Sequence, residues 1–361
     1  MSYSFLRESK LYIVYGGNKY RIYTSSALTF NQTFAEESYS VKTLHDQSKM
    51  FEGSSITKAN PASFSFDVPL TTEKDDNDKH WESIILTLAS DLSSNILNSF
   101  TMYVQTGSST FKLEGAIITS ASFDFIPQNQ FTMRVEGEGT KLSRVGATSF
   151  TAGNFVVDTN YIITDEGNTS FTGIGAANNN IGTEFTATGV GSGTGIADYL
   201  PPGTTQSESA TRTPLIVYPV VTLNDGSAKT MGNILSVNLN IQNEMEWTPY
   251  ETLHDSLNST TMFPSAHTVG KRIISGEIRQ YQIDTNNSDD NVRQFDDFST
   301  NTNLTITAKN VSGDTDFFKI QINPAMYTAR MQPEEVYTQS YDFRSLDNTD
   351  PVSTQITLYP N

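Results

Sequence analysis

The sequence predicts a mainly β fold, with two tandem β-sandwich or barrel-like domains, each with one short helix and one long loop, and a small inserted β module. Three observations predict it. The segment Thr43–Asp46 recurs letter for letter as Thr252–Asp255, alternating apolar and polar residues fill both halves, and a Gly- and Thr-rich stretch separates them. Alternation is typical of half-buried strands, and self-similarity indicates a duplicated unit.

The flanks of the repeated segment favour a duplication over chance. Asp255 lies 209 positions after Asp46 (255 − 46), and the alternating segments Leu28–Asn31 and Val237–Asn240 share that offset. Further pairs keep the same order along the chain with slightly drifting spacing: Met50-Phe51 with Met262-Phe263, Asp76-Asn77 with Asp290-Asn291, Trp81 with Phe295, Phe111–Leu113 with Phe318–Ile320, and Pro127 with Pro333. We therefore expect a first copy over 1–148, an insert over 149–212 and a second copy over 213–361.

The first copy is predicted to begin with a hairpin. Leu11–Val14 and Lys19–Tyr23 flank Gly16-Gly17-Asn18, whose residues tolerate the positive φ of a tight turn. A strand over Leu28–Phe34 follows, and then a long polar loop over Ala35–Pro61. Phe64, Phe66 and Val68 alternate with polar residues as in a half-buried strand.

One helix is predicted over Lys79–Leu88. Asp76 or Asp78 caps its start, and Trp81, Ile84, Ile85 and Leu88 share one face. Four strand-like segments complete the first copy: Phe100–Gln105, Thr110–Leu113, Ala116–Phe125 and Phe131–Glu138.

The second copy is expected to keep this order. Its helix carries Val292, Phe295 and Phe298 on one face, after a cap at Ser288 or Asp289. A turn at Asp225-Gly226 separates the first two strands. The predicted strands are Val217–Leu223, Leu235–Gln242, Ile273–Ile283, Leu304–Ala308, Phe317–Ile322, Ala325–Met331 and Glu335–Phe343.

The insert differs in composition from both copies. Thr151–Gln206 contains no Lys or Arg, and Tyr161–Thr164 and Glu184–Thr188 are predicted to be short strands. The glycine run Gly189–Gly195 leads into Pro201-Pro202-Gly203. A phosphate-binding loop would need a following Lys-Ser/Thr and a helix, so a small β module on a flexible tether is the preferred interpretation.

Composition excludes several classes of protein. The 361 residues carry a formal net charge of −17, which argues against a nucleic-acid-binding groove. The chain has no cysteine, so it holds neither disulfides nor thiolate sites. We find no apolar stretch of membrane-spanning length. Arg7 and Lys10 are not followed by the apolar core of a signal peptide.

No catalytic, cofactor-binding or metal site is predicted. His45 and His254 each precede an Asp, but no serine nucleophile elbow accompanies them, and one His with one Asp is too few ligands for a metal. A turn cap for Asp and a packing role for His are preferred. Asp76-Asn77-Asp78 with Glu82 lacks the central glycine of a calcium loop and is better explained as a helix cap. The sequence therefore indicates that the protein is not an enzyme.

The order strand pair, long loop, strand, helix and two further strand pairs resembles the tail tube proteins of long-tailed bacteriophages. Ser40–Asp46, ahead of Phe51, resembles the inter-ring loop of that family, and Ala152–Gly195 resembles a small β module found in phage structural proteins. The resemblance covers nearly the whole chain. It implies a virion protein, assembled in the host cytoplasm, whose stacked rings form the tail tube, the conduit for DNA ejection.

The resemblance also implies partners. Most members of that family carry one tube domain and form hexamers, so a chain with two copies is expected to form a homotrimer with pseudo-sixfold symmetry. Further partners are other tail proteins, such as a terminator, the baseplate or a sheath. DNA would pass through an acidic lumen without specific binding, and no membrane is involved.

The loops Glu36–Lys58 and Glu246–Lys271 are expected to become ordered against neighbouring subunits, because they have few apolar residues for packing on their own domain. The predicted inter-ring or subunit interface residues are Thr43, Leu44, His45, Asp46, Met50, Phe51, Thr252, Leu253, His254, Asp255, Met262 and Phe263. The insert is expected to project outward as a surface decoration.

Two other classes remain open. Receptor-binding β-sandwich adhesins are also rich in Thr, Asn and Gly and poor in cysteine. That hypothesis predicts clustered exposed aromatic residues or calcium ligands on loops, which the sequence does not show convincingly. An all-β enzyme ranks last, because paired catalytic groups are missing.

Overall fold

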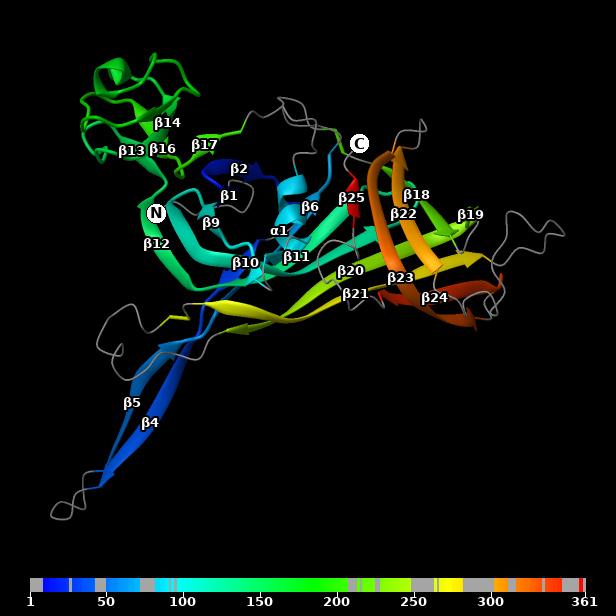
Figure 1. The fold of residues 1–361 in the computed structure, drawn as a ribbon. Helices are drawn as coiled ribbons and strands as arrows, with labels where there is room; N and C mark the ends of the chain where they lie inside the picture. The colour runs from blue at the N-terminus through cyan, green and yellow to red at the C-terminus, as the bar shows by residue number, and fades with distance from the viewer. Residues whose placement is uncertain are drawn as a thin grey trace.

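The structure is a computed structural model, and it describes residues 9–25, 28–42, 50–71, 82–90, 92–93, 96–206, 213–214, 216–224, 228–247, 263–264, 266–281, 302–310, 316–332, 335–345 and 357–359. The described chain is mainly β, which confirms the predicted fold class (Figure 1). Within these ranges α1 (Ser83–Ser90) is the one α-helix.

A long antiparallel sheet runs through both halves of the chain. Its strands in spatial order are β3 (Thr29–Asn31), β6 (Ala62–Pro69), β11 (Thr132–Gly139), β10 (Ser109–Phe125), β20 (Ile234–Trp247), β21 (His267–Tyr281), β24 (Thr338–Ser345) and β23 (Asp316–Gln332). Within the described part of one chain this sheet stays open, with β3 at one edge and the last residues of β23 at the other.

Two flanking sheets pack on the long sheet. The first has the order β12 (Lys141–Ala147), β10, β9 (Phe100–Gln105), β1 (Lys10–Tyr15), β2 (Asn18–Ile22) and β17 (Thr204–Thr205). The second has the order β25 (Thr357–Tyr359), β23, β22 (Thr302–Asn310), β18 (Val217–Asn224) and β19 (Ala228–Thr230). One continuous hydrophobic core lies between the layers, with contacts such as the edge-on rings of Phe64 and Phe100.

The strands β10 and β23 each belong to two sheets. The first residues of β10 pair with β9 and β12, and those from Ile117 onward pair with β11 and β20. Gly115 lies between the two parts with φ +57°, a conformation that glycine adopts without strain. The sequence suggested separate strands over Thr110–Leu113 and Ala116–Phe125. That expectation was wrong, because the strand bends at the glycine and continues.

Other local expectations are confirmed. The turn between β1 and β2 contains Gly16 and Gly17, both with positive φ, and β9 has the predicted bounds. The helix α1 begins later than expected, and Ile84, Ile85 and Leu88 are buried on it as predicted. Its predicted caps, Trp81, the second-copy helix and the Asp225-Gly226 turn lie outside the described residues.

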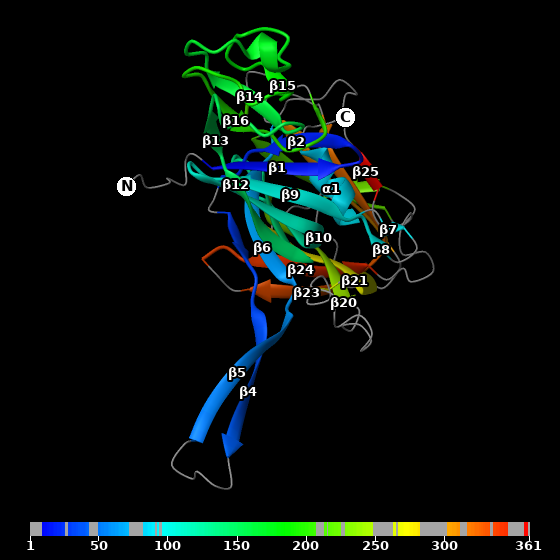
Figure 2. The same cartoon turned by 90° about the vertical axis from the view of Figure 1, so that its left-hand side faces the viewer.

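The long polar loop of the first copy is instead a β-hairpin. The strands β4 (Phe34–Lys42) and β5 (Met50–Ala59) pair in antiparallel register and form an arm that projects from the body (Figures 1 and 2). Backbone groups make these ladder hydrogen bonds, so a hairpin forms without regular apolar alternation. The expectation of a loop without strands over Ala35–Pro61 was therefore wrong.

The pairing order of the first half recurs in the second half. In the first half the order is β2–β1–β9–β10–β12, with β10 continuing to β11, β6 and β3; in the second it is β19–β18–β22–β23–β25, with β23 continuing to β24, β21 and β20. β10 and β23 have equal lengths of 17 residues. A register shift occurs at Ala35/Glu36 in β4 and at Glu244/Met245 in β20, again 209 positions apart (244 − 35).

Residues 149–199 form a small sheet of their own. Its order is β13 (Ser149–Thr151), β16 (Ile196–Tyr199), β14 (Asn160–Asp165) and β15 (Glu184–Thr186), and the 3₁₀ turn η2 (Phe171–Ile174) covers it. We call this segment the module. Phe155, Tyr161, Phe171 and Phe185 pack together as its core. The module and the arm project at opposite ends of the molecule in both views (Figures 1 and 2).

The glycine run Gly189–Gly195 is part of the module. Asn168 Oδ1 accepts a hydrogen bond from the Thr194 amide at 2.7 Å, and Thr169 Oγ1 accepts one from the Gly195 amide at 2.9 Å. The expectation of a flexible tether at this run was wrong, because these side chains and the close approach of Gly195 to the Phe171 ring fix its backbone.

Candidate assembly surfaces

The two halves meet strand to strand at a seam between β10 and β20. The register runs antiparallel from Ser120 opposite Gln242 to Phe125 opposite Val237. On one face of this seam Phe123 and Leu239 lie opposite each other and are fully buried. On the other face Asn238 Nδ2 donates to Asp124 Oδ1 at 2.5 Å. The seam therefore continues both the core and the polar surface of the sheet from one half into the other.

The ends of β20 and β21 extend past the seam and cover the first half. Trp247, with Met245 and Val269, packs against Leu97 and Ile117. Leu97 belongs to the short strand β8 (Ile96–Leu97), which pairs with β7 (Leu92–Ser93). Trp247 Nε1 donates to Glu138 Oε2 at 2.6 Å, so the orientation of this partly buried ring is fixed. An amphipathic Trp with a bonded indole is a typical interface anchor.

His267 completes this contact from β21. Its ring lies edge-on to the Trp247 ring at 5.5 Å between centroids, and its Nε2 is 3.2 Å from the Leu97 carbonyl oxygen. A neutral imidazole with a proton on Nε2 can donate to that oxygen. Burial lowers the pKa of His267, and the Leu97 carbonyl opposes this shift, so the neutral ring is favoured.

Arg272 of β21 ties the second half to the end of α1. Its Nη1 donates to the Ser90 carbonyl at 2.7 Å, its Nη2 to the Ala89 carbonyl at 3.2 Å, and its Nε to Asn243 Oδ1 at 2.7 Å. Asn243 is buried and also donates to the Ala89 carbonyl. The last carbonyls of a helix lack intrahelical partners and carry partial negative charge, which a guanidinium neutralises.

The outer face of the long sheet is polar across the seam. Rows of directly opposed residues cross it, one running Asp67, Arg134, Ser122, Asn240, Ser275 and Arg344, and another running Asp124, Asn238, Glu277, Asp342 and Thr328. The alternate residues face the core and are apolar through most of the sheet. This face, which we call the polar face, thus offers small polar and charged groups of both signs to solvent.

The structure describes few of the interface residues that the sequence suggested. Thr43–Asp46, Thr252–Asp255 and Met262 lie outside the described residues. Met50 and Phe51 begin β5, opposite Lys42 and Val41 in the arm. Phe263 is half-buried, with Lys141 Nζ 5.0 Å from its ring centroid.

Sequence reasoning missed the residues that join the halves. Trp247, Arg272 and Asn243 were not singled out, although a rare Trp at the end of a long alternating segment was an available signal. The buried Asn243 breaks the apolar alternation of β20, and that break was a second available signal.

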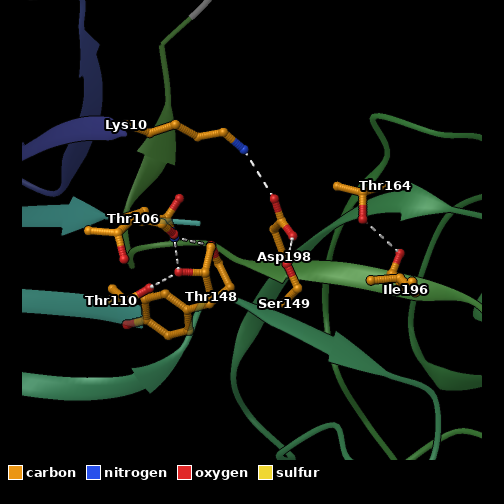
Figure 3. A network of polar contacts seen from close by, with 10 residues as sticks. Lys10, Thr106, Thr110, Thr148, Ser149, Thr164, Ile196 and Asp198 are labelled. Atoms are coloured by element: carbon orange, nitrogen blue, oxygen red, sulfur yellow. Dashed lines mark hydrogen bonds and ion pairs between the residues drawn. The ribbon is translucent and has the colours of Figure 1, made fainter. Parts of the chain in front are cut away.

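The module is fixed to the first flanking sheet by polar and aromatic contacts. Lys10 Nζ lies 3.1 Å from Asp198 Oδ2, and Ser149 Oγ donates to Asp198 Oδ1 at 2.6 Å (Figure 3). Gln105 Nε2 donates to the Tyr199 carbonyl at 2.5 Å. A small cluster of Tyr12, Tyr103 and Leu200 fills the junction.

Lys19 makes a second ionic contact to the module. Its ammonium is buried and lies 3.6 Å from Glu184 Oε2. Burial lowers the pKa of Lys19, and the Glu184 carboxylate opposes that shift. After the module, β17 pairs in parallel with β2 and leads the chain back along the first flanking sheet.

Among the described residues no three His, Asp or Glu side chains gather closely enough to hold a metal ion. No helix in the described ranges has the length and apolar character needed to cross a membrane.

The open edges of the long sheet, at β3 and at the end of β23 within the described part of the chain, present unpaired backbone groups to which another strand can pair. The chain matches the bacteriophage baseplate tube protein family over residues 1–145 and 194–359, and it belongs to that family. The segment between these ranges contains most of the module. No curated protein matches the chain closely enough to count as a relative.

Membership makes this protein a structural component of the phage tail, located in the virion, and favours a non-enzymatic role. It points to the baseplate tube, and not specifically to the tail tube of long-tailed phages that the sequence resembles.

Proposed function

We propose that three copies of this chain form a closed ring of six equivalent units, and that stacked rings form a tube for DNA ejection in the phage tail. The observation that carries the proposal is the seam between β10 and β20, which joins two units of like topology edge to edge. Head-to-tail contacts that repeat and close generate a ring. Two units in one chain then make three chains equivalent to six units.

The polar face is the surface that would line such a tube. It carries Ser, Asn and Thr with charges of both signs, such as Arg134 and Glu136, which pair with each other at 3.0 Å. Together with the net charge of −17, these groups offer no continuous track of cations to DNA phosphates. The duplex would therefore slide through the tube without specific binding.

The arm and the module have separate roles in this proposal. The arm projects far from the body, as an inter-ring contact requires (Figure 2). The proposed interface residues Met50 and Phe51 lie at the start of its strand β5. The module lies at the opposite end and would decorate the outer surface of the assembly. Assembly would take place in the host cytoplasm, with other tail proteins at the two ends of the tube.

The mass of the purified assembly tests the ring. Native mass spectrometry and electron microscopy should show rings of three chains. A ring of six chains would contradict the proposal, because the duplicated unit would then not replace two subunits. Dispersed monomers that bind glycans would instead support the adhesin hypothesis.

A shortened arm tests the role of the arm. Replacing residues 39–53 by Asn-Gly keeps the paired residues Ser38 and Ser54 next to a two-residue turn that suits a hairpin. We expect the same thermal unfolding as the parent and rings that no longer stack. The matched control replaces residues 152–195 by a short Gly/Ser linker, which should leave stacking intact and narrow the outer diameter. Normal stacking with the short arm would exclude the inter-ring role.

A further inference from the structure

The internal seam also defines how one chain meets the next. We propose that the end of β23 of one chain pairs in antiparallel register with β3 of the next chain, with Gln332 opposite Thr29 and Arg330 opposite Asn31. This inference rests on the proposed ring, and it adds the identity of the two strands and their register. The partner is a second copy of this chain.

Each central strand of the first half has an equivalent strand in the second half. In the first half Phe64 of β6 lies opposite Gly137 of β11, and its ring lies over the glycine. In the second half the pair is reversed, with Gly276 of β21 opposite Phe343 of β24. β6 therefore corresponds to β21, and β11 to β24.

These two correspondences identify the equivalent residues in the neighbouring strands. Phe30 of β3 lies opposite Phe64, and Leu239 of β20 lies opposite Gly276, so Phe30 corresponds to Leu239. On the other side Ala121 of β10 lies opposite Val135. In the second half Ala329 of β23 lies opposite Tyr341, the residue that corresponds to Val135. Ala121 therefore corresponds to Ala329.

At equivalent positions, the first half is paired at the internal seam, whereas the second half ends in an open strand edge within the described part of the chain. The end of β10 pairs on one side with β11 and on the other with β20. The corresponding residues of β23, from Thr328 to Gln332, pair with β24 on one side only within the described part of the chain. Likewise β20 has β21 and β10 as neighbours, whereas β3 has β6 alone among the described strands.

The side chains at and just after β3 are less buried than their counterparts at the internal seam. Leu239 is fully buried at the internal seam, whereas its counterpart Phe30 is only half-buried and touches the Phe111 ring at 5.4 Å. Phe34, the counterpart of the buried Asn243, is 48% exposed. An apolar ring at an open strand edge gains burial when a further strand pairs there.

Transferring the internal register to the two edges gives the intermolecular contacts. Asp124 opposite Asn238 becomes Gln332 opposite Thr29, and Ser122 opposite Asn240 becomes Arg330 opposite Asn31. Thr29, Asn31 and Arg330 are exposed and point to the polar face in the free chain, as Asp124 and Asn238 do at the seam.

Cysteine crosslinking tests the register, because the chain has no cysteine of its own. Thr29→Cys with Gln332→Cys places thiols directly opposite each other. Thr29→Cys with Arg330→Cys is the matched control, slipped by two residues on the same face. Asp124→Cys with Asn238→Cys is the internal positive control, since these residues are partners within one chain.

Assembled particles of each variant are oxidised and run on a non-reducing gel. The first pair should give covalent dimers and trimers and stop at three chains, with about tenfold more product than the slipped pair, because Cβ atoms two residues out of register are too far apart for a disulfide. The internal control should crosslink without any increase in mass.

The outcomes separate this inference from the proposed ring. Rings that form normally but show no product, or more product from the slipped pair, would overturn the strand register and leave the ring in place. Absence of rings in the parent chain would overturn both. Where Thr29→Cys disturbs its bond to Ser65, Asn31→Cys with Arg330→Cys tests the same register, and its failure in intact rings also overturns it.

Discussion

The two halves share a pairing order but fill equivalent core positions with different chemistry. In the first half Val68, Met133 and Val135 are fully buried and apolar. The positions that correspond to them hold Gln280, Gln339 and Tyr341, which are also buried. A strand ladder is made of backbone groups, so it tolerates this exchange provided that the buried polar groups find partners.

The polar core of the second half is connected by hydrogen bonds. Tyr341 Oη donates to Gln339 Oε1 at 2.6 Å, and Gln280 Nε2 donates to Tyr341 Oη at 3.0 Å. Gln280 Oε1 is buried without a hydrogen-bond partner in the structure. This part of the fold therefore gains specificity from its network and loses stability to an unsatisfied acceptor.

Both halves contain a glycine with an aromatic ring packed over it. Replacing either glycine should have the largest effect on the free energy of unfolding. A Cβ at Gly137 would overlap the Ile117 carbonyl and the Phe64 ring, and one at Gly276 would overlap the Asn238 carbonyl and the Phe343 ring. We expect Gly137→Ala and Gly276→Ala each to lower the free energy of unfolding by about 3 kcal/mol.

Urea denaturation measures this loss. Gly146→Ala is the control, because a Cβ there meets no atom within 4 Å. If Gly137→Ala and Gly276→Ala were both as stable as that control, the contact between ring and glycine would not require glycine at these positions.

Removal of one polar atom from the second core should have the next largest effect. Tyr341→Phe leaves Gln280 and Gln339 without their shared hydroxyl and should cost about 1–2 kcal/mol in the free energy of unfolding. The triple variant Gln280→Val, Gln339→Met, Tyr341→Phe makes the site resemble the first half and should recover that loss, because no buried polar side-chain atom of the network remains. A triple variant less stable than the single one would contradict this account.

The same single variant tests the burial of the phenol. Burial raises the pKa of Tyr341 to about 12. The unfolded chain releases this proton near its ordinary value of about 10, so the stability that the neutral phenol contributes is present below pH 10 and is lost as the pH rises toward 12. Tyr341→Phe should show a smaller loss of stability over that range than the parent.

A smaller effect is expected where the second half covers the first. The folded state lowers the pKa of His267, so the unfolded chain takes up this proton first as the pH falls below about 6.5. Stability from the His267 contact is therefore present above that pH and is lost on acidification. His267→Gln should make the thermal midpoint less sensitive to pH between 7.5 and 5.5. An unchanged pH dependence would show that His267 does not titrate in this contact.

The smallest effect is expected at the partly exposed ion pair of Lys112 and Glu114, whose charged atoms lie 2.6 Å apart on β10. The corresponding residues of β23 are Lys319 and Gln321, so Glu114→Gln makes the first half resemble the second. We expect a change within about 0.5 kcal/mol, because exposed ion pairs contribute little. Urea denaturation at low and high salt measures it. A loss well above that value would show that the pair has a role that its exposure does not indicate.

Much of the local structure followed from short-range patterns. Alternation located β6 and β9, paired glycines located the first turn, and apolar spacing located the buried face of α1 with Ile84 and Leu88. The arm was missed because residues 35–61 lack regular alternation, and the bend in β10 was missed because Gly115 resembled a strand end. Of the proposed interface residues, only Met50, Phe51 and Phe263 lie in the described ranges.

By itself the sequence determined the mainly β class and the repeat at an offset of 209, because both periodicity and self-similarity depend only on the order of residue types along the chain. Only the tertiary structure decided that β10 joins β20, that Trp247 and Arg272 fasten one half to the other, and that the module docks through Asp198. Strand pairing uses backbone groups that almost every residue carries, so the choice between competing edges depends on the packing of the whole chain.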